Sequence, residues 1–227
     1  MKNKIELTKK QKRDGKMMNR IYNSGKMKEA YEFALKLYNQ NQRDLFCKYS
    51  YATMAGDYSY HKSLNKKEKN KLFNLAKRLL KQVYSDPDLK KYPEPLVNVI
   101  KNEYYFFHKL HKKQYEHGKK NYEKGYKGSS YSMCVGACEL ALEYSKKSKR
   151  WLAMHWAKKS IEGFKKYEKV NPNWYNINYF AADAYAILGN EKKAISIFED
   201  MYRKQNRPID KDEVKSFKTK IEKYKKL

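Results

Sequence analysis

The sequence predicts an all-helical protein, and three observations lead to that prediction. Among its 227 residues are only five Pro and nine Gly, which is few for this length. The Pro residues fall between runs of Lys, Leu, Ala, Glu and Met, which favour helices. No segment alternates apolar and polar residues as a half-buried strand does. Hydrophobic residues make up 41% of the chain, enough to bury a core of ordinary size.

Turn and breaker residues divide the chain into helical hairpins, taken here in order. In the first hairpin Gly25 marks a turn, and Ala30 follows at the start of an apolar helical face. The second ends before Pro87, the third closes near Gly128, and the fourth ends before Pro172. The approximate expected hairpins are 8–40, 44–86, 93–128, 130–171 and 174–205, followed by a closing helix at 210–227.

The hairpin at 174–205 has the most regular pattern of small and aromatic residues. Ala182 and Tyr185 precede a turn at Gly189, and Ala194 and Phe198 follow it at helical spacing. This pattern resembles a tetratricopeptide repeat (TPR), in which small residues lie where two helices cross closely and aromatic residues fill the groove beside them. The resemblance covers one full repeat unit of the chain.

A shorter match lies near the N-terminus. Gly25 and Ala30 repeat the spacing of Gly189 and Ala194, and Pro172 stands where a TPR ends with proline. The spacing between the middle units is unequal, so they either carry longer helices and loops or belong to a looser TPR-like superhelix. The resemblance implies a single domain, 1–227, of about five antiparallel hairpins stacked as a right-handed solenoid.

The closing helix has the polar composition expected of a solenoid cap. Val214, Phe217, Ile221 and Tyr224 fall on one side, and the remaining positions are mostly polar. Asp210 is a favourable residue to begin this helix, because an Asp side chain can accept from free backbone N–H groups.

The TPR resemblance also implies a concave binding groove lined by the first helix of each pair. In the strongest repeat, the expected groove positions are Asn176, Tyr179 and Asp183. The known TPR clamp for chaperone C-terminal carboxylates uses Lys and Asn at such positions. Asp183 would repel a carboxylate, so we do not expect that ligand here.

The net charge of +27 predicts a large positive surface potential. Such a field attracts nucleic acid, anionic membranes or acidic proteins, and it gives no information about the fold. The alternative interpretation is that the charge has no anionic partner and reflects only the Lys-rich composition that an AT-rich genome encodes. The Lys runs fall mainly on turns and second helices, which places the positive charge on the expected convex face.

The sequence offers no catalytic constellation. It has no Gly-rich phosphate loop, no nucleophile beside a spaced His and acid, and no paired carboxylates in an apolar setting. Arg150 and His155 have the spacing of the HEPN ribonuclease motif, but Trp151 replaces the usual polar residue after the Arg. We therefore expect Trp151 and His155 to pack at or beside a repeat interface, and no enzyme activity.

Neither a metal nor a cofactor is expected. His108, His111 and His117 with Cys134 and Cys138 match no zinc-binding spacing. The two cysteines are instead typical of small residues on a buried helix. The chain has three cysteines in all, too few to suggest a disulfide framework. We therefore expect reduced thiols in a reducing compartment.

We interpret the chain as a non-catalytic scaffold that binds a protein or peptide partner, acidic partners included. Two alternatives remain. The chain is a basic protein that binds the phosphate backbone of nucleic acid, or it is a structural subunit of an assembly such as a phage or virus particle. The charged N-terminus lacks the apolar segment of a signal peptide or membrane anchor. The expected location is the cytoplasm, or a virion for the assembly alternative, and oligomerisation is compatible with either.

Overall fold

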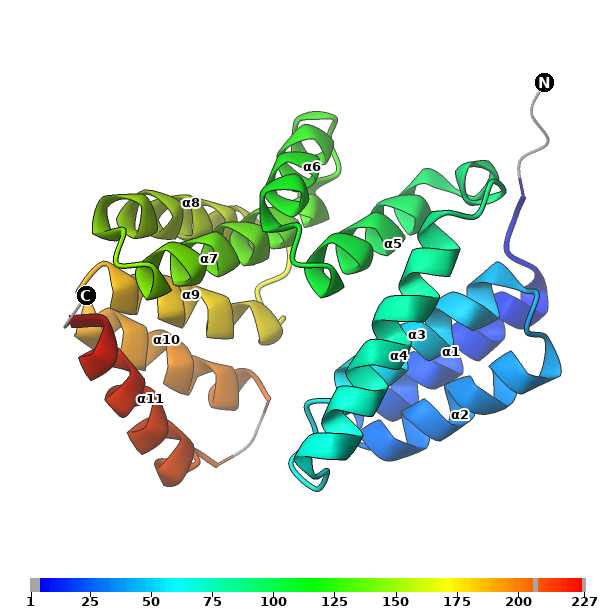
Figure 1. Ribbon diagram of the computed structural model, residues 1–227, viewed down its shortest axis with the longest axis horizontal. Coiled ribbons are helices and arrows are strands. Elements are labelled where there is room, and N and C mark those ends of the chain that lie inside the picture. Colours follow the sequence, from blue (N-terminus) through cyan, green and yellow to red (C-terminus); the bar gives the residue numbers. More distant parts are fainter. Residues whose placement is uncertain (1–4, 206–207, 226–227) are drawn as a thin grey trace. The chain divides into compact units, whose positions relative to one another are not determined.

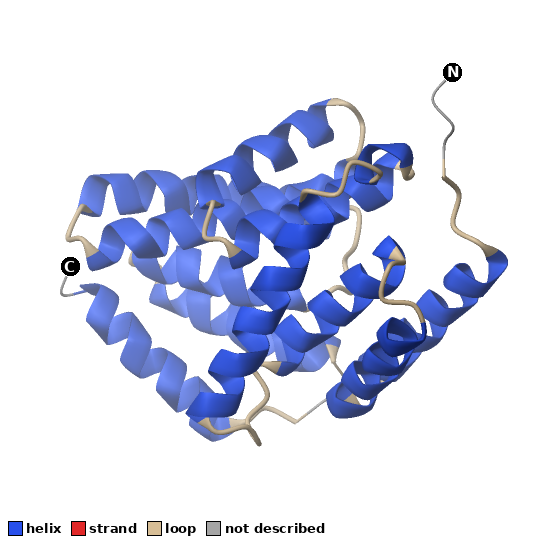
Figure 2. Ribbon diagram, turned by 45° about the vertical axis from the view of Figure 1, so that its right-hand side comes forward, coloured by secondary structure: helices blue, strands red, loops and turns tan. Residues whose placement is uncertain are grey.

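The computed structural model describes residues 5–205 and 208–225, and every regular element in these ranges is a helix (Figures 1 and 2). The all-helical prediction is confirmed. The chain divides into two compact units, Met1–His108 and Lys109–Leu227. The boundary lies inside the expected hairpin 93–128, so the two helices of that hairpin belong to different units.

Within residues 5–108, the described part of the first unit, there are five α-helices and a short 3-10 helix (Figure 1). The bounds are α1 Lys9–Asn23, α2 Met27–Gln40, α3 Leu45–Tyr58, α4 Lys66–Tyr84, η1 Leu89–Lys91 and α5 Glu94–Phe107. Each α-helix packs against the next one in the chain. Ala30 and Ala34 of α2, Ala52 and Ala55 of α3, and Ala76 of α4 are wholly buried, so small residues line the crossings between these helices.

Side-chain caps define where helices of the first unit begin. Thr8 and Gln11 form a capping box at the start of α1, and Asn65 and Glu68 form another at the start of α4. Each box satisfies two backbone N–H groups that the helix itself leaves without acceptors. Asp44 caps α3 by accepting from the backbone N–H of Cys47.

The described residues of the second unit, 109–205 and 208–225, form six α-helices and a short 3-10 helix. The bounds are α6 His111–Glu123, η2 Lys127–Ser129, α7 Ser130–Lys146, α8 Arg150–Glu168, α9 Asn176–Ile187, α10 Glu191–Lys204 and α11 Lys211–Lys225. Helix α7 packs against α6, α8 and α9, while α9 also packs against α10 and α11. Pro172 is exposed in the connection between α8 and α9.

Close backbone approach is the main packing feature of the second unit. A Cβ atom added at Gly163 of α8 would lie 2.6 Å from the backbone nitrogen of Cys134 on α7. The hydroxyl of Ser160 donates to the Cys134 carbonyl at 2.9 Å across the same crossing. Residues with small or absent side chains therefore let α7 and α8 approach closely.

The closing helix α11 packs against α9 and α10. Val214, Phe217 and Ile221 are buried, and the Phe217 ring stacks on Phe198 with 4.4 Å between centroids. Asp210 accepts from the backbone N–H of Glu213, as its position before the helix predicts. Across the described ranges, no helix combines the length and the apolar character needed to cross a bilayer.

Candidate binding groove

Helices α8, α9 and α10 of the second unit enclose a groove of about 320 Å³. Phe164, Tyr185 and Ile197 supply its apolar side chains, one from each helix. The remaining lining residues are polar or charged: Lys165, Glu168, Lys193, Ser196, Asp200 and Arg203. A groove with apolar contacts and charged groups suits an amphipathic ligand such as a peptide segment.

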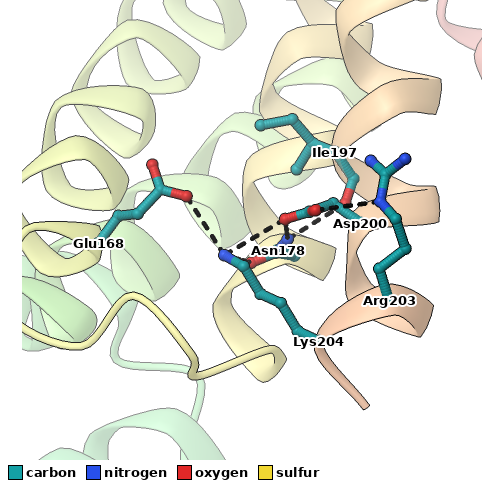
Figure 3. Close-up of polar contacts among 6 residues, drawn as sticks. All are labelled: Glu168, Asn178, Ile197, Asp200, Arg203 and Lys204. Atoms are coloured by element: carbon teal, nitrogen blue, oxygen red, sulfur yellow. Dashed lines mark hydrogen bonds and ion pairs between the residues drawn. The ribbon is translucent and has the colours of Figure 1, made fainter. Parts of the chain in front are cut away.

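Lys204 of α10 contacts polar side chains of α8, α9 and its own helix beside the groove (Figure 3). Its Nζ lies 3.2 Å from Glu168 of α8, 3.4 Å from the Asn178 amide oxygen of α9 and 3.3 Å from Asp200 on its own helix. Only 15% of the Lys204 side chain is exposed, so these contacts hold the three helices in a fixed arrangement.

Asp200 is the second centre of this polar network. It accepts from the Asn178 amide nitrogen at 3.2 Å and from Arg203 Nε at 3.3 Å, and the same Asn178 nitrogen donates to the Ile197 carbonyl (Figure 3). Burial acts to raise the pKa of Asp200, but Lys204 together with the Asn178 and Arg203 hydrogen bonds outweighs it, and the net pKa is lowered. Asp200 therefore carries its charge at neutral pH inside a satisfied network.

This network leaves the groove with uncompensated positive charge. Both lining carboxylates, Glu168 and Asp200, already bind cations. Lys165 and Lys193 are exposed, and neither forms an ion pair within the residues that the structure describes. Electrostatically, the groove suits an anionic ligand.

Two of the three sequence-predicted groove residues, Tyr179 and Asp183, contact α11. Asp183 is 1% exposed, and its carboxylate binds Lys220 of α11 at 2.6 Å. The Lys220 Nζ also lies 5.5 Å from the ring centroid of Tyr179, which is 45% exposed. Asn176, at the start of α9, is partly buried. The structure thus brings Tyr179 and Asp183 together around a lysine of the closing helix.

The residues of the repeat pattern occupy turns and helix crossings. Ala182 and Ala194 are wholly buried, and Phe198 is buried in the same cluster. Gly189 and Gly25 both adopt left-handed backbone conformations, with φ of +78° and +80°. Such angles strain residues that have a Cβ atom, which accounts for Gly at both turns.

Two carboxylates of the first unit, Asp57 and Glu103, are withdrawn from water and have raised pKa values. Burial raises the pKa of Asp57 on α3 to about 6, although a hydrogen bond from Tyr22 lowers it in part. Burial, with a smaller contribution from the Asp57 charge, raises the pKa of Glu103 on α5 to about 8. The two residues lie far apart in the chain on different helices, so sequence spacing does not reveal that the Asp57 charge acts on Glu103.

Trp151 and His155 lie on the exposed side of α8. Trp151 is 74% exposed and His155 is exposed, so neither packs in the core of the second unit. The core face of α8 carries Ala153 and Ala157 instead. Arg150 is exposed at the first position of α8.

The cysteines and histidines considered as metal ligands lie in separate environments. Cys134 and Cys138 are wholly buried in α7, and burial raises the pKa of both thiols. His111 is buried at the start of α6, and burial lowers its pKa. No three His, Cys, Asp or Glu side chains gather into a possible metal site in residues 5–205 and 208–225.

Comparison with known proteins identifies no relative. No protein-family model matches the chain, and no curated protein matches its sequence.

Proposed function

We propose that this chain is a non-catalytic binding module with a TPR-like helical-repeat architecture, and that it holds an acidic peptide segment in the groove between α8, α9 and α10. The observation that carries the proposal is the composition of the groove. Apolar side chains from three helices lie beside two lysines that no described carboxylate neutralises.

The repeat architecture is supported by the packing of consecutive helices in the second unit. Three residues join α7 to α8, and three join α9 to α10. Wholly buried alanines and close backbone approach at the crossings are what a stack of helical hairpins requires. A right-handed solenoid over 1–227 with α11 as its cap is the arrangement we propose on this basis.

An acidic peptide fits the groove better than a neutral one. Lys165 and Lys193 can each bind a carboxylate without breaking an existing ion pair, whereas Arg203 and Lys204 already bind acids. Tyr185 is partly exposed and can contact an apolar side chain of the same peptide, above the buried Phe164 and Ile197. The Lys204 network keeps the helices in place, so little conformational entropy is lost on binding.

The test is selection of a random peptide library, displayed on phage, against the purified full-length protein. We expect enriched peptides to combine Asp or Glu with one large apolar residue. Synthetic copies should bind the K165A/K193A variant about tenfold more weakly, because two charge-assisted contacts are lost. The readout is fluorescence anisotropy of the labelled peptide.

The matched control is the K66A/K67A variant, which removes the same charge from exposed positions of α4 in the first unit. It should bind the peptides within about twofold of the unmodified protein, since these residues lie outside the groove. Equal losses in the two variants, or enrichment of peptides without acidic residues, would show that the groove is not the site.

A further inference from the structure

Trp151 is the most exposed of the large hydrophobic side chains in the described structure, at 74%. It follows the turn between α7 and α8, on the first turn of α8. The core side of α8 is already filled by Ala153, Ala157 and Phe164, so packing does not account for the indole. A single exposed apolar residue is ordinary, and the surroundings of Trp151 must supply any argument for a role.

The Trp151 ring forms a small aromatic platform with His155, one helical turn further on. Their ring centroids are 5.8 Å apart and their planes meet at 22°, so the two rings are stacked. On its other side His155 meets the edge of Trp156, with 88° between the planes. The imidazole thus supports one face of the Trp151 indole, and the other face remains available to a flat ligand.

Three exposed cations lie close to Trp151 in the sequence, at the end of α7 and the start of α8. Lys146, Lys149 and Arg150 are all exposed, and none of them forms an ion pair in the part of the chain that the structure describes. The nearby Glu143 already binds Lys147 at 2.6 Å. We call these three residues the turn cations.

Further along α8 the exposed side remains polar. Lys158 follows His155 at the next position on the same helical face and is exposed. Glu162, one turn beyond it, already binds Lys166. The surface therefore combines one flat aromatic platform, several free cations and neutralised acids.

From this combination we infer that the Trp151 platform and the turn cations bind single-stranded nucleic acid. One unpaired base stacks on the free face of Trp151, while the turn cations and Lys158 contact the phosphates on either side. Such contacts read no base edge, so the binding is tolerant of sequence. This surface is separate from the groove residues, and the inference does not rest on the proposed peptide binding.

The surroundings of Trp151 favour nucleic acid over other anionic partners. An anionic membrane would require further apolar side chains beside the indole, but the flanking exposed positions 147–150, 155 and 158 are all polar. An acidic peptide would use the cations without needing a flat ring. A base with its phosphates uses both features.

The test measures fluorescence anisotropy of a fluorescein-labelled poly(U) oligonucleotide with the full-length protein at increasing salt. W151L keeps an apolar side chain but removes the aromatic face, and we expect about tenfold weaker binding. W151F keeps a ring and should stay within about threefold of the unmodified protein. The K149A/R150A variant should bind more weakly and reduce the slope of log K against log salt by about 1.4.

W174L is the matched control, because Trp174 is also exposed, at 40%, in the connection between α8 and α9. It should bind poly(U) within about twofold of the unmodified protein. The stacking role would be overturned if W151L and W174L weakened poly(U) binding equally. It would also be overturned if W151F lost as much poly(U) affinity as W151L. Binding of phosphatidylserine vesicles that depends on Trp151, with poly(U) binding that does not, would assign the surface to membranes instead. Circular dichroism of each variant checks that the helices are intact.

Discussion

The two units bury carboxylates in different ways. In the first unit Asp57 and Glu103 are partly buried near each other, and neither forms an ion pair within residues 5–205 and 208–225. In the second unit Asp183 is more deeply buried but binds Lys220 at 2.6 Å. The difference shows two solutions to one physical problem: in the first unit a raised pKa keeps Glu103 protonated at neutral pH, and in the second unit a cation from the closing helix binds Asp183.

The sign of the pH dependence follows from these environments. The folded-state pKa of Glu103 is raised from 4.5 to about 8, so the folded chain binds this proton more tightly than the unfolded chain. Stability from this group is fully present below about pH 4.5 and is lost as the pH rises toward 8. Burial also raises the pKa of Asp183, while Lys220 opposes that rise.

The largest expected effect comes from removing the cation in the second unit. K220M leaves the Asp183 carboxylate buried without its partner, and we expect the free energy of unfolding to fall by about 3 kcal/mol at pH 8. The loss should be smaller at pH 5, because Asp183 can then take up a proton more easily. Urea denaturation followed by circular dichroism measures both values.

Lys225 of the same helix provides the control for this substitution. It binds Glu191 and Glu222, but all three side chains are exposed to a large degree. K225M should therefore cost far less stability than K220M. If K220M and K225M lower the free energy of unfolding equally, the burial of Asp183 does not matter to stability. The second unit would then not depend on a cation for its buried carboxylate, and the contrast between the units would be wrong.

The first unit should respond in the opposite direction. E103Q replaces a carboxylate that must ionise in a poor environment with a neutral side chain of the same shape. We expect the unfolding free energy to rise by about 2 kcal/mol at pH 8 and to change little at pH 5. The same denaturation experiment at the two pH values measures this difference.

Glu32 on α2 is an exposed glutamate of the same unit and serves as the comparison. E32Q removes the same charge, and its effect should stay within about 0.5 kcal/mol at both pH values. A stabilisation at pH 8 that is equal in E32Q and E103Q would reflect the net charge of the chain and not the burial of Glu103.

The sequence predicts the helices well because each is encoded locally. Gly25 and Gly189 mark turns, Pro87 and Pro172 follow helix ends, and alanines mark helix faces. The expected helices agree closely with the observed ones, from α1 to α11. The division at His108 could not be predicted, because it depends on which helices pack together and not on any local signal.

The candidate site was harder to predict than the helices. The concave-groove residues followed from the TPR pattern, but the pattern cannot show that Lys220, 37 positions after Asp183, reaches its carboxylate. Likewise Lys204 meets Glu168 across 36 positions. Contacts over such distances depend on helix rotation and packing, so neither composition nor periodicity reveals them.

The smallest expected effects concern how closely helices approach in each unit. An added Cβ at Gly163 meets the backbone of Cys134 at 2.6 Å, whereas an added Cβ at Gly56 meets the ring of Phe107 at 2.2 Å. Both G163A and G56A gain about 1 kcal/mol of helix propensity. The steric cost outweighs that gain, and we expect each to lose about 1 to 2 kcal/mol of stability net.

A second substitution separates the two cases, because a side chain can be shortened and a backbone cannot. F107L removes the ring that an alanine at position 56 would meet, so G56A should cost less in the F107L background than alone, as a double-mutant cycle measures. C134A leaves the Cys134 backbone in place, so the G163A cost should persist in that background. C134A could instead reduce the stability cost of G163A as much as F107L reduces the cost of G56A. In that case side-chain volume, and not a backbone contact, would limit how closely the helices approach in both units.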